Sequence, residues 1–205
     1  MHPVPPGYSD NSHINVAEIL PRSRIYGPGE RMVIWVQGCA LRCPGCWNEE
    51  MWPFEERNLY TTDVLLSEIL SVEDLEGITL LGGEPLHQAP ALLELVTRVR
   101  SSGLSVILYT GFEEEEITDP VSLALFQTSD IVIFGRYRED LRSDFLKWRG
   151  SENQKIVFPT SRYRAMKDEI DELTNEIEIH IADDGMITLV GYPGNEIKEC
   201  IHEVL

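Results

Sequence analysis

The amino-acid sequence predicts an α/β fold built on a parallel sheet. Along most of its 205 residues, short apolar runs of strand length alternate with longer segments whose apolar residues recur at helical spacing. Glycine-containing loops follow several of the apolar runs. This alternation is typical of parallel strands covered by helices. The length suits one domain, which we expect to span residues 1–205.

The first three quarters of the chain supply the predicted sheet. Residues 1–12 hold three prolines and a polar run, so we expect a loose lead-in there. Strands are expected at 14–25 and 32–37, on either side of a turn at Gly27-Pro28-Gly29. A threonine and an aspartate that are able to cap open a predicted helix at 61–70. The later predicted strands are 78–81, 104–109 and 131–134, and the later helices are 89–101 and 121–128.

The end of the chain, residues 159–205, is an extension to which the sequence assigns no role. Strands at 155–158 and 178–181 flank a predicted helix at 162–174. A last strand at 186–190 follows the turn Asp183-Asp184-Gly185. Cys200 lies on a short terminal helical stretch, where we expect a free buried thiol and not a ligand.

The charge balance excludes some partners. Lysine and arginine total 17 against 35 aspartates and glutamates, which gives a formal net charge of -18. Nucleic acid is not an expected partner, because phosphate binding requires clustered cations.

No apolar run approaches the roughly 18 residues that a membrane helix needs, and the N-terminus lacks the pattern of a signal peptide. We therefore expect a cytoplasmic protein without a membrane segment.

Four loops that carry candidate functional residues follow predicted strands. They are the cysteine loop after Gly38, the loop Gly82-Gly83-Glu84-Pro85, the loop Tyr109-Thr110-Gly111 and the turn at Gly135. Ligand chemistry in parallel α/β folds gathers at the carboxyl ends of the strands. The sequence therefore predicts one functional rim to which all four loops contribute.

Three of the four cysteines form the first candidate site. Cys39, Cys43 and Cys46 have the spacing C-x3-C-x2-C, so three thiolates are able to converge from one loop. In a cubane iron–sulfur cluster this set would leave one iron open to a substrate or cofactor. A structural zinc site, which closes with four ligands, and plain core or surface cysteines are the alternatives.

The loop Gly82-Gly83-Glu84-Pro85 narrows these alternatives. Two glycines after a strand allow the backbone to approach a ligand closely, and Glu84 offers a carboxylate to a cationic amine. A Gly-Gly turn before a helix is also a common structural feature. Because the loop lies about forty residues after the cysteine motif, the two motifs together are more specific than either one alone.

Taken together, these motifs resemble the radical S-adenosylmethionine superfamily. The resemblance implies a [4Fe-4S] cluster on Cys39, Cys43 and Cys46, with the methionine end of the cofactor near Gly82, Gly83 and Glu84. It further implies that the amine and carboxylate of that end chelate the open iron. An electron from the cluster would then break the sulfonium C–S bond and give methionine plus a 5′-deoxyadenosyl radical.

Within that superfamily, the chain is most similar to the activating proteins of anaerobic ribonucleotide reductase. The similarity runs from about residue 26 to 157, and its matching segments are Gly27-Pro28-Gly29, 38–48 with Trp52, 82–85, 109–111, 130–137 and 148–154. It implies an incomplete (β/α) barrel, a large glycyl-radical partner and a flavodoxin- or ferredoxin-type electron donor. Two features depart from the family pattern, namely Phe134 where an aspartate is usual and the tail after Gln154.

The same resemblance suggests roles for several further residues. Trp47 would stack near the adenine or shield the cluster, and Tyr109 and Thr110 would meet the ribose. The candidates for contacts to the cofactor or the partner are Arg149, Asn153 and Gln154. Ordinary packing, turn or surface roles are the alternatives for each. We expect His87 to be a solvated or capping histidine, because the chemistry needs no general base.

Three hypotheses follow for function. The leading one is a glycyl-radical-activating enzyme that acts on anaerobic ribonucleoside-triphosphate reductase. The second keeps the cluster and cofactor but changes the acceptor to a small molecule or another peptide, which Phe134 and the unmatched tail favour. The third is a non-enzymatic iron–sulfur or zinc protein.

Overall fold

The fold is a mixed sheet with a parallel centre. The computed structural model describes residues 13–181, 185 and 187–194. Over these residues, the main sheet has seven strands in the order β3-β1-β2-β4-β5-β6-β7. Its four central strands are parallel, and they are β2 (Arg31–Val36), β4 (Gly77–Gly82), β5 (Ser105–Thr110) and β6 (Ile131–Phe134). The predicted α/β class with a parallel sheet is therefore confirmed.

Antiparallel strands extend both margins of this parallel centre. On one side, β1 (His13–Ser23) pairs with β2, and the short β3 (Asn58–Thr61) pairs with β1. On the other side, β7 (Lys155–Val157) pairs with β6. Within the described residues the main sheet is open, and β3 and β7 are its outermost strands.

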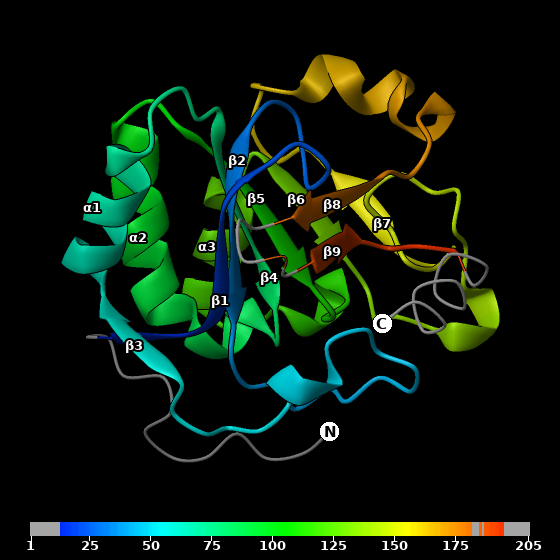
Figure 1. Cartoon of the computed structure of the whole chain (residues 1–205), viewed down its shortest axis with the longest axis horizontal. Coiled ribbons are helices and arrows are strands. Elements are labelled where there is room, and N and C mark those ends of the chain that lie inside the picture. Colours follow the sequence, from blue (N-terminus) through cyan, green and yellow to red (C-terminus); the bar gives the residue numbers. More distant parts are fainter. Residues whose placement is uncertain (1–12, 182–184, 186, 195–205) are drawn as a thin grey trace.

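Three α-helices cover one face of the sheet, and Figure 1 shows them together on one side of it. They are α1 (Thr62–Ser71), α2 (Ala89–Ser101) and α3 (Pro120–Thr128). Thr61 caps α1 as expected, because its hydroxyl accepts from the backbone N–H of Val64. Alternate strand residues such as Ile34 and Leu80 pack against these helices in the largest buried cluster.

The opposite face carries a second, smaller sheet. β8 (Ile177–Ile181) and β9 (Ile187–Gly191) form an antiparallel hairpin that lies across the sheet from the helices (Figure 1). Val190 of β9 packs with Ile25 and Trp35, whose side chains point away from the helices. Both faces of the central strands are thus buried, which accounts for their continuous apolar sequences.

One prediction about the tail needs correction. The segment 162–174 is not one α-helix. It forms two short 3-10 helices, and only Ile170 among its described side chains is buried. A short helix without a packed apolar face is marginal in water, so tertiary contacts decide its form. Further 3-10 helices occupy Glu49–Met51, Pro85–Gln88, Glu114–Glu116 and Glu139–Leu141, and the tail pair spans Arg164–Asp168 and Ile170–Glu172.

Some predicted features lie outside the described residues, and one strand of the sheet was not predicted. The lead-in 1–12, Asp183, Asp184, Met186 and the terminal stretch with Cys200 are not among the described residues. Strand β3 was not predicted, because its four residues are mostly exposed and follow no apolar pattern. Among the described residues, no helix is long and apolar enough to span a membrane.

A buried arginine fixes the amino ends of the parallel strands. Arg31 is fully buried, and its guanidinium donates to the Thr79 hydroxyl at 2.9 Å and the Ser105 hydroxyl at 2.9 Å. It also donates to the backbone carbonyls of Pro28, Ile78 and Ser105. One side chain therefore ties β2, β4 and β5 to the turn that precedes β2.

Replacing this side chain should weaken the whole fold. In Arg31→Met, the buried oxygens of Thr79 and Ser105 lose their charged donor, so the free energy of unfolding should fall by about 2–4 kcal/mol. Urea denaturation of the unloaded protein measures this. The control is Arg57→Met, which removes an exposed pair with Glu55 and should change stability by less than about 0.5 kcal/mol. Equal effects of the two substitutions would contradict the prediction.

Candidate functional site

A cavity lies at the carboxyl ends of the four parallel strands. Its volume is about 160 Å³. The cysteine loop, the end of β4, the end of β5 and the turn after β6 all contribute to its wall. Lining residues from these segments include Cys39, Cys43, Cys46, Gly82, Gly83, Glu84, Tyr109, Thr110, Gly111 and Gly135. The predicted convergence of four separate loops on one rim is therefore confirmed.

Backbone hydrogen bonds hold the cysteine loop against the sheet. The N–H of Gly38 donates to the carbonyl of Met51 at 2.8 Å, and the N–H of Cys39 donates to that of Trp52 at 3.0 Å. The carbonyl of Gly38 accepts from the N–H of Glu84 at 2.9 Å. A Cβ on Gly83 would lie 2.5 Å from the Gly38 carbonyl oxygen, so only glycine fits. The Gly-Gly loop thus makes a close backbone approach to the cysteine loop itself.

The three cysteine sulfurs face hydrogen-bond donors. Backbone N–H groups of Leu41 and Arg42 point at the sulfur of Cys39, that of Tyr137 at Cys43, and that of Asn48 at Cys46. These donors stabilise negative charge on sulfur.

Burial works in the opposite direction on the same sulfurs. Desolvation raises the pKa of all three thiols, and it raises that of Cys39 to about 12. Thiolates in this cavity therefore need a bound cationic centre to balance their charge. The donor set, with one buried and two half-buried thiols and N–H groups aimed at sulfur, suits metal ligation.

The arrangement of the sulfurs bears on the kind of metal centre. Among the residues that the structure describes, no three His, Cys, Asp or Glu side chains surround one point closely enough to hold a single ion. A four-iron cluster makes a different demand, because its thiolates bind separate irons. Three thiols along the wall of one cavity fit that demand.

Glu84 joins the ends of β4 and β5. Its side chain is 1% exposed, and one carboxylate oxygen accepts from the Thr110 hydroxyl at 2.8 Å and from the N–H of Leu86 at 2.9 Å. The other oxygen accepts from the N–H of Gly111 at 2.8 Å. Burial raises the pKa of Glu84 to about 7, although these hydrogen bonds oppose the rise. The carboxylate therefore positions the β5 loop as well as bordering the cavity.

His87 is neither solvated nor a capping residue, which corrects the prediction. It is 9% exposed and lies between the rings of Phe54 and Phe112, with centroids 5.6 Å away in both cases. Its Nε2 accepts from the backbone N–H of Ala40 at 3.1 Å. His87 thus holds the cysteine loop at the residue after Cys39.

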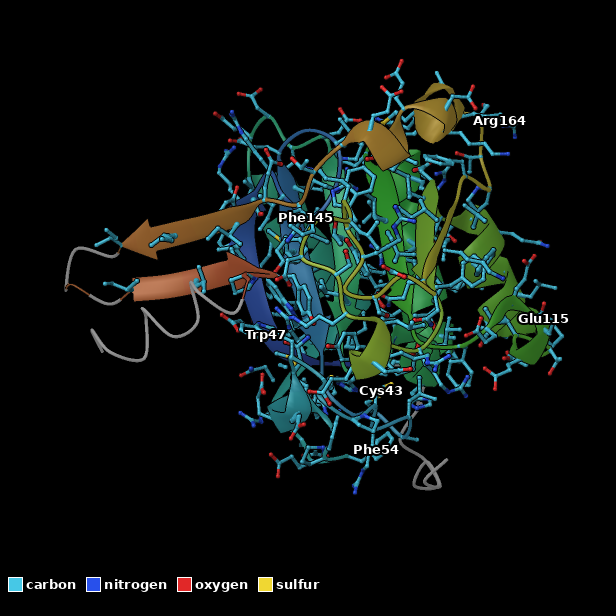
Figure 2. The ribbon with its side chains drawn as sticks, turned by 90° about the vertical axis from the view of Figure 1, so that its right-hand side faces the viewer. Cys43, Trp47, Phe54, Glu115, Phe145 and Arg164 are labelled. Atoms are coloured by element: carbon cyan, nitrogen blue, oxygen red, sulfur yellow. The ribbon has the colours of Figure 1, made fainter. Side chains whose placement is uncertain are left out.

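A second cavity opens beside the first. It has a volume of about 190 Å³, and both Trp47 and Arg149 line it. The two cavities share Cys46, Asn48, Leu81, Tyr109, Tyr137 and Gln154. Asn153 lies outside both linings, and its side-chain amide donates to the backbone carbonyl of Arg136. Figure 2 shows Cys43 and Trp47 toward the same end of the molecule.

Phe134 belongs to the core and not to either cavity lining. It is 2% exposed, and its ring meets that of Phe126 at a centroid distance of 5.9 Å. The aromatic ring therefore packs β6 against α3 at this position.

Sequence reasoning missed several lining residues of the second cavity. Trp35 points into it from β2, and a period-two reading of the strand would have placed this side chain on the face away from the helices. Asn175 and Tyr192 reach it from the tail. The sequence signal for Tyr192 is the segment Gly191-Tyr192-Pro193-Gly194, which belongs to the tail without a family match.

Removing the acceptor atom of His87 should loosen the cysteine loop. His87→Phe leaves the N–H of Ala40 unpaired in a buried place, which costs about 1–3 kcal/mol. We expect this variant to retain less than half of the wild-type iron after reconstitution, and His87→Gln to recover part of it. Iron content and visible absorbance measure the difference. His180→Phe on the hairpin is the control, and equal iron loss in the Phe and Gln variants of His87 would contradict a positioning role.

The same histidine should make the unloaded protein sensitive to acid. Burial lowers the pKa of His87 to about 4 from 6.5, so the fold favours the neutral ring. This stabilisation is complete above pH 6.5 and is lost as the pH falls from 6.5 through 4. At about 1.4 kcal/mol per pKa unit, up to about 3 kcal/mol is at stake. Urea unfolding at pH 7.5 and 4.5 should show a smaller fall for His87→Gln than for wild type; equal falls would refute the assignment.

Comparisons with known proteins agree with this geometry. The family described as a 4Fe-4S single cluster domain matches residues 25–157. Among solved structures, QueE from Escherichia coli aligns with 49% of this chain and 52% of its own, at 20% identity and a TM-score of 0.37. That likeness is too partial to bear on the fold.

The curated relatives are more informative. The anaerobic ribonucleoside-triphosphate reductase-activating protein of Escherichia coli (strain K12) is 30% identical over 151 residues, which cover 70% of this chain and 97% of that protein. Proteins of the same name from Vibrio cholerae and Enterobacteria phage T4 are 32% and 33% identical, over 70% of this chain and 97% and 93% of their own lengths. The chain belongs to the family of anaerobic ribonucleoside-triphosphate reductase-activating proteins.

Proposed function

We propose that this chain is a radical S-adenosylmethionine enzyme that installs a glycyl radical on anaerobic ribonucleoside-triphosphate reductase. One observation carries the proposal. The C-x3-C-x2-C cysteines and the Gly82-Gly83 loop border one cavity in a chain that matches the activating proteins over nearly their whole length. An enzyme of this class needs that combination of an incompletely ligated cluster and a neighbouring cofactor site.

Cys39, Cys43 and Cys46 are the proposed ligands of a [4Fe-4S] cluster. When bound, the cluster supplies the electron that cleaves the sulfonium C–S bond of S-adenosylmethionine to methionine and a 5′-deoxyadenosyl radical. The protein's share is to hold the thiolates and to exclude water. Two features of the cavity support these roles. N–H groups face the sulfurs, and the apolar side chains of Leu81 and Trp52 form part of the wall.

The proposed binding site for S-adenosylmethionine follows the rim across the sheet. Gly82 and Gly83 would receive the methionine end, because neither glycine adds a side chain to the cavity. Glu84 would act there through its charge, since a cationic amine nearby favours the ionised carboxylate. Tyr109 and Thr110, at the end of β5, would meet the ribose.

The remaining predicted residues are associated with the second cavity, where Trp47 would stack near the adenine or shield the cluster. Trp47 and Arg149 line the second cavity, where Arg149 offers a fork of donors to a carboxylate or a backbone carbonyl. Asn153 would act indirectly, because its amide holds the carbonyl of Arg136, the residue before Tyr137, whose N–H faces Cys43.

We also propose that the sheet works as an incomplete (β/α) barrel in one domain over 1–205, with 159–205 as its extension. The parallel centre of the sheet and the one-sided layer of helices support this reading. The proposal includes a cytoplasmic location and a flavodoxin- or ferredoxin-type electron donor. A small-molecule or different peptide acceptor is the second candidate.

Anaerobic reconstitution with iron and sulfide tests the leading function. Wild type reduced with dithionite should convert S-adenosylmethionine into 5′-deoxyadenosine, and the reductase from the same genome should then show a glycyl radical by electron paramagnetic resonance. Cys43→Ala should lose both products because it removes one cluster ligand.

Cys200→Ala is the matched control, and it should keep both activities. 5′-Deoxyadenosine without a radical on the reductase would point to the second candidate function. A reconstituted cluster that never cleaves the cofactor would overturn the enzyme assignment.

A further inference from the structure

The C-terminal hairpin reaches the functional site although it lies beyond residues 25–157, which the family matches. At the end of β9, the N–H of Gly191 donates to the Tyr26 hydroxyl at 2.8 Å. Gly191 has a φ of +103°, and a Cβ there would lie 2.8 Å from the backbone oxygen of Glu176 and 2.9 Å from Ile25 Cδ1. Glycine therefore suits this position, where the hairpin turns close to its own backbone and to the segment after β1. Figure 2 shows the hairpin on the same side of the molecule as Trp47.

Tyr192 follows this turn, and its side chain is held from several directions. Its hydroxyl donates to the Tyr137 hydroxyl at 2.7 Å and accepts from Arg142 Nη1 at 2.7 Å. The Arg142 guanidinium also lies 4.3 Å from the ring centroid. The ring of Trp47 meets it edge-on at 6.1 Å. These contacts fix one orientation of the tyrosine ring.

The backbone around Tyr192 is fixed as well. Its carbonyl accepts from Asn175 Nδ2 at 2.7 Å, and the carbonyl of Pro193 accepts from Arg142 Nη2 at 2.7 Å. The tail is therefore bonded to Arg142, which precedes the family segment 148–154, and does not merely lie over the site.

The fixed ring forms part of the wall of the second cavity. Because that cavity shares Cys46 and Tyr109 with the first, an occupant would lie directly beside the proposed cluster and cofactor. Aromatic side chains dominate its wall, among them Trp35, Trp47 and Tyr192. Its volume of about 190 Å³ is below the range of about 300–1,000 Å³ that is usual for drug-sized ligands. A short stretch of extended backbone with little side chain suits this shape.

We propose that the second cavity admits the acceptor and that Tyr192 is a specificity-determining residue that closes its outer wall, so that only a narrow peptide loop with glycine at its tip reaches the cofactor. This inference rests on the proposed function and deepens it. Glycine carries no side chain, so its Cα is able to approach closely in a space that flat rings confine. A wider cavity should bind the acceptor's glycine loop more weakly and leave the positions of the three cysteines unchanged.

The test compares Tyr192→Ala with two reference variants. Tyr192→Phe keeps the ring but removes the hydroxyl that bonds Tyr137 and Arg142. Tyr163→Ala is the matched control, because Tyr163 is also half-buried and its hydroxyl bonds Glu76 and Ser105 near the amino ends of the strands. Thermal melting checks that all variants fold.

Three readouts separate the outcomes. For Tyr192→Ala, 5′-deoxyadenosine formation without acceptor should stay near wild type, while glycyl radical formed per 5′-deoxyadenosine should fall by about tenfold or more. Calorimetric binding of the reductase to the cluster-free protein should weaken by a similar factor. Tyr192→Phe should fall between wild type and Tyr192→Ala in both acceptor readouts.

Two results would overturn the inference alone. One is a Tyr192→Ala variant that activates and binds the reductase as well as Tyr163→Ala does. The other is a parallel loss of acceptor-independent 5′-deoxyadenosine, which would place Tyr192 in support of the cofactor site. A wild-type protein that cleaves S-adenosylmethionine but leaves the reductase without a radical overturns the proposed function, and the inference falls with it.

Discussion

Parallel pairing of β2, β4, β5 and β6 is the constraint on which the site depends. The register sets Val36 opposite Gly82, and Thr110 opposite Phe134, so the four strands end at nearly one level. Loops that leave such a sheet must satisfy their own polar backbone. Here the N–H of Gly83 donates to the Val36 carbonyl at 2.7 Å, and that of Gly135 donates to the Phe112 carbonyl at 3.1 Å. The rim is therefore an extension of the sheet's own hydrogen bonding.

The two ends of the parallel strands are stabilised by different means. At the amino ends, the Arg31 guanidinium occupies the space between β2, β4 and β5 and is saturated by buried oxygens. At the carboxyl ends, uncharged backbone contacts and the single carboxylate of Glu84 hold the loops around open cavities. This separation lets the carboxyl end remain hollow while the other end supplies rigidity.

Local sequence patterns predicted most of the sheet and the shared rim. Apolar runs of four to six residues located β2, β4, β5 and β6, because strands buried on both faces admit few polar residues. The failures have one cause, which is dependence on distant partners. Strand β3 is defined by its pairing with β1, and the environment of His87 by Ala40, Phe54 and Phe112. The place of Tyr192 depends on Arg142, fifty residues away. No short window of sequence contains such pairs.

The contact between Gly38 and Gly83 has a consequence for how this protein is able to change. Two loops that are about forty residues apart in sequence meet backbone to backbone, at a distance that leaves no room for a Cβ. The positions of the two loops are therefore coupled. An insertion, a deletion or a larger residue in either loop displaces the other, so thiol geometry and cofactor geometry cannot drift independently.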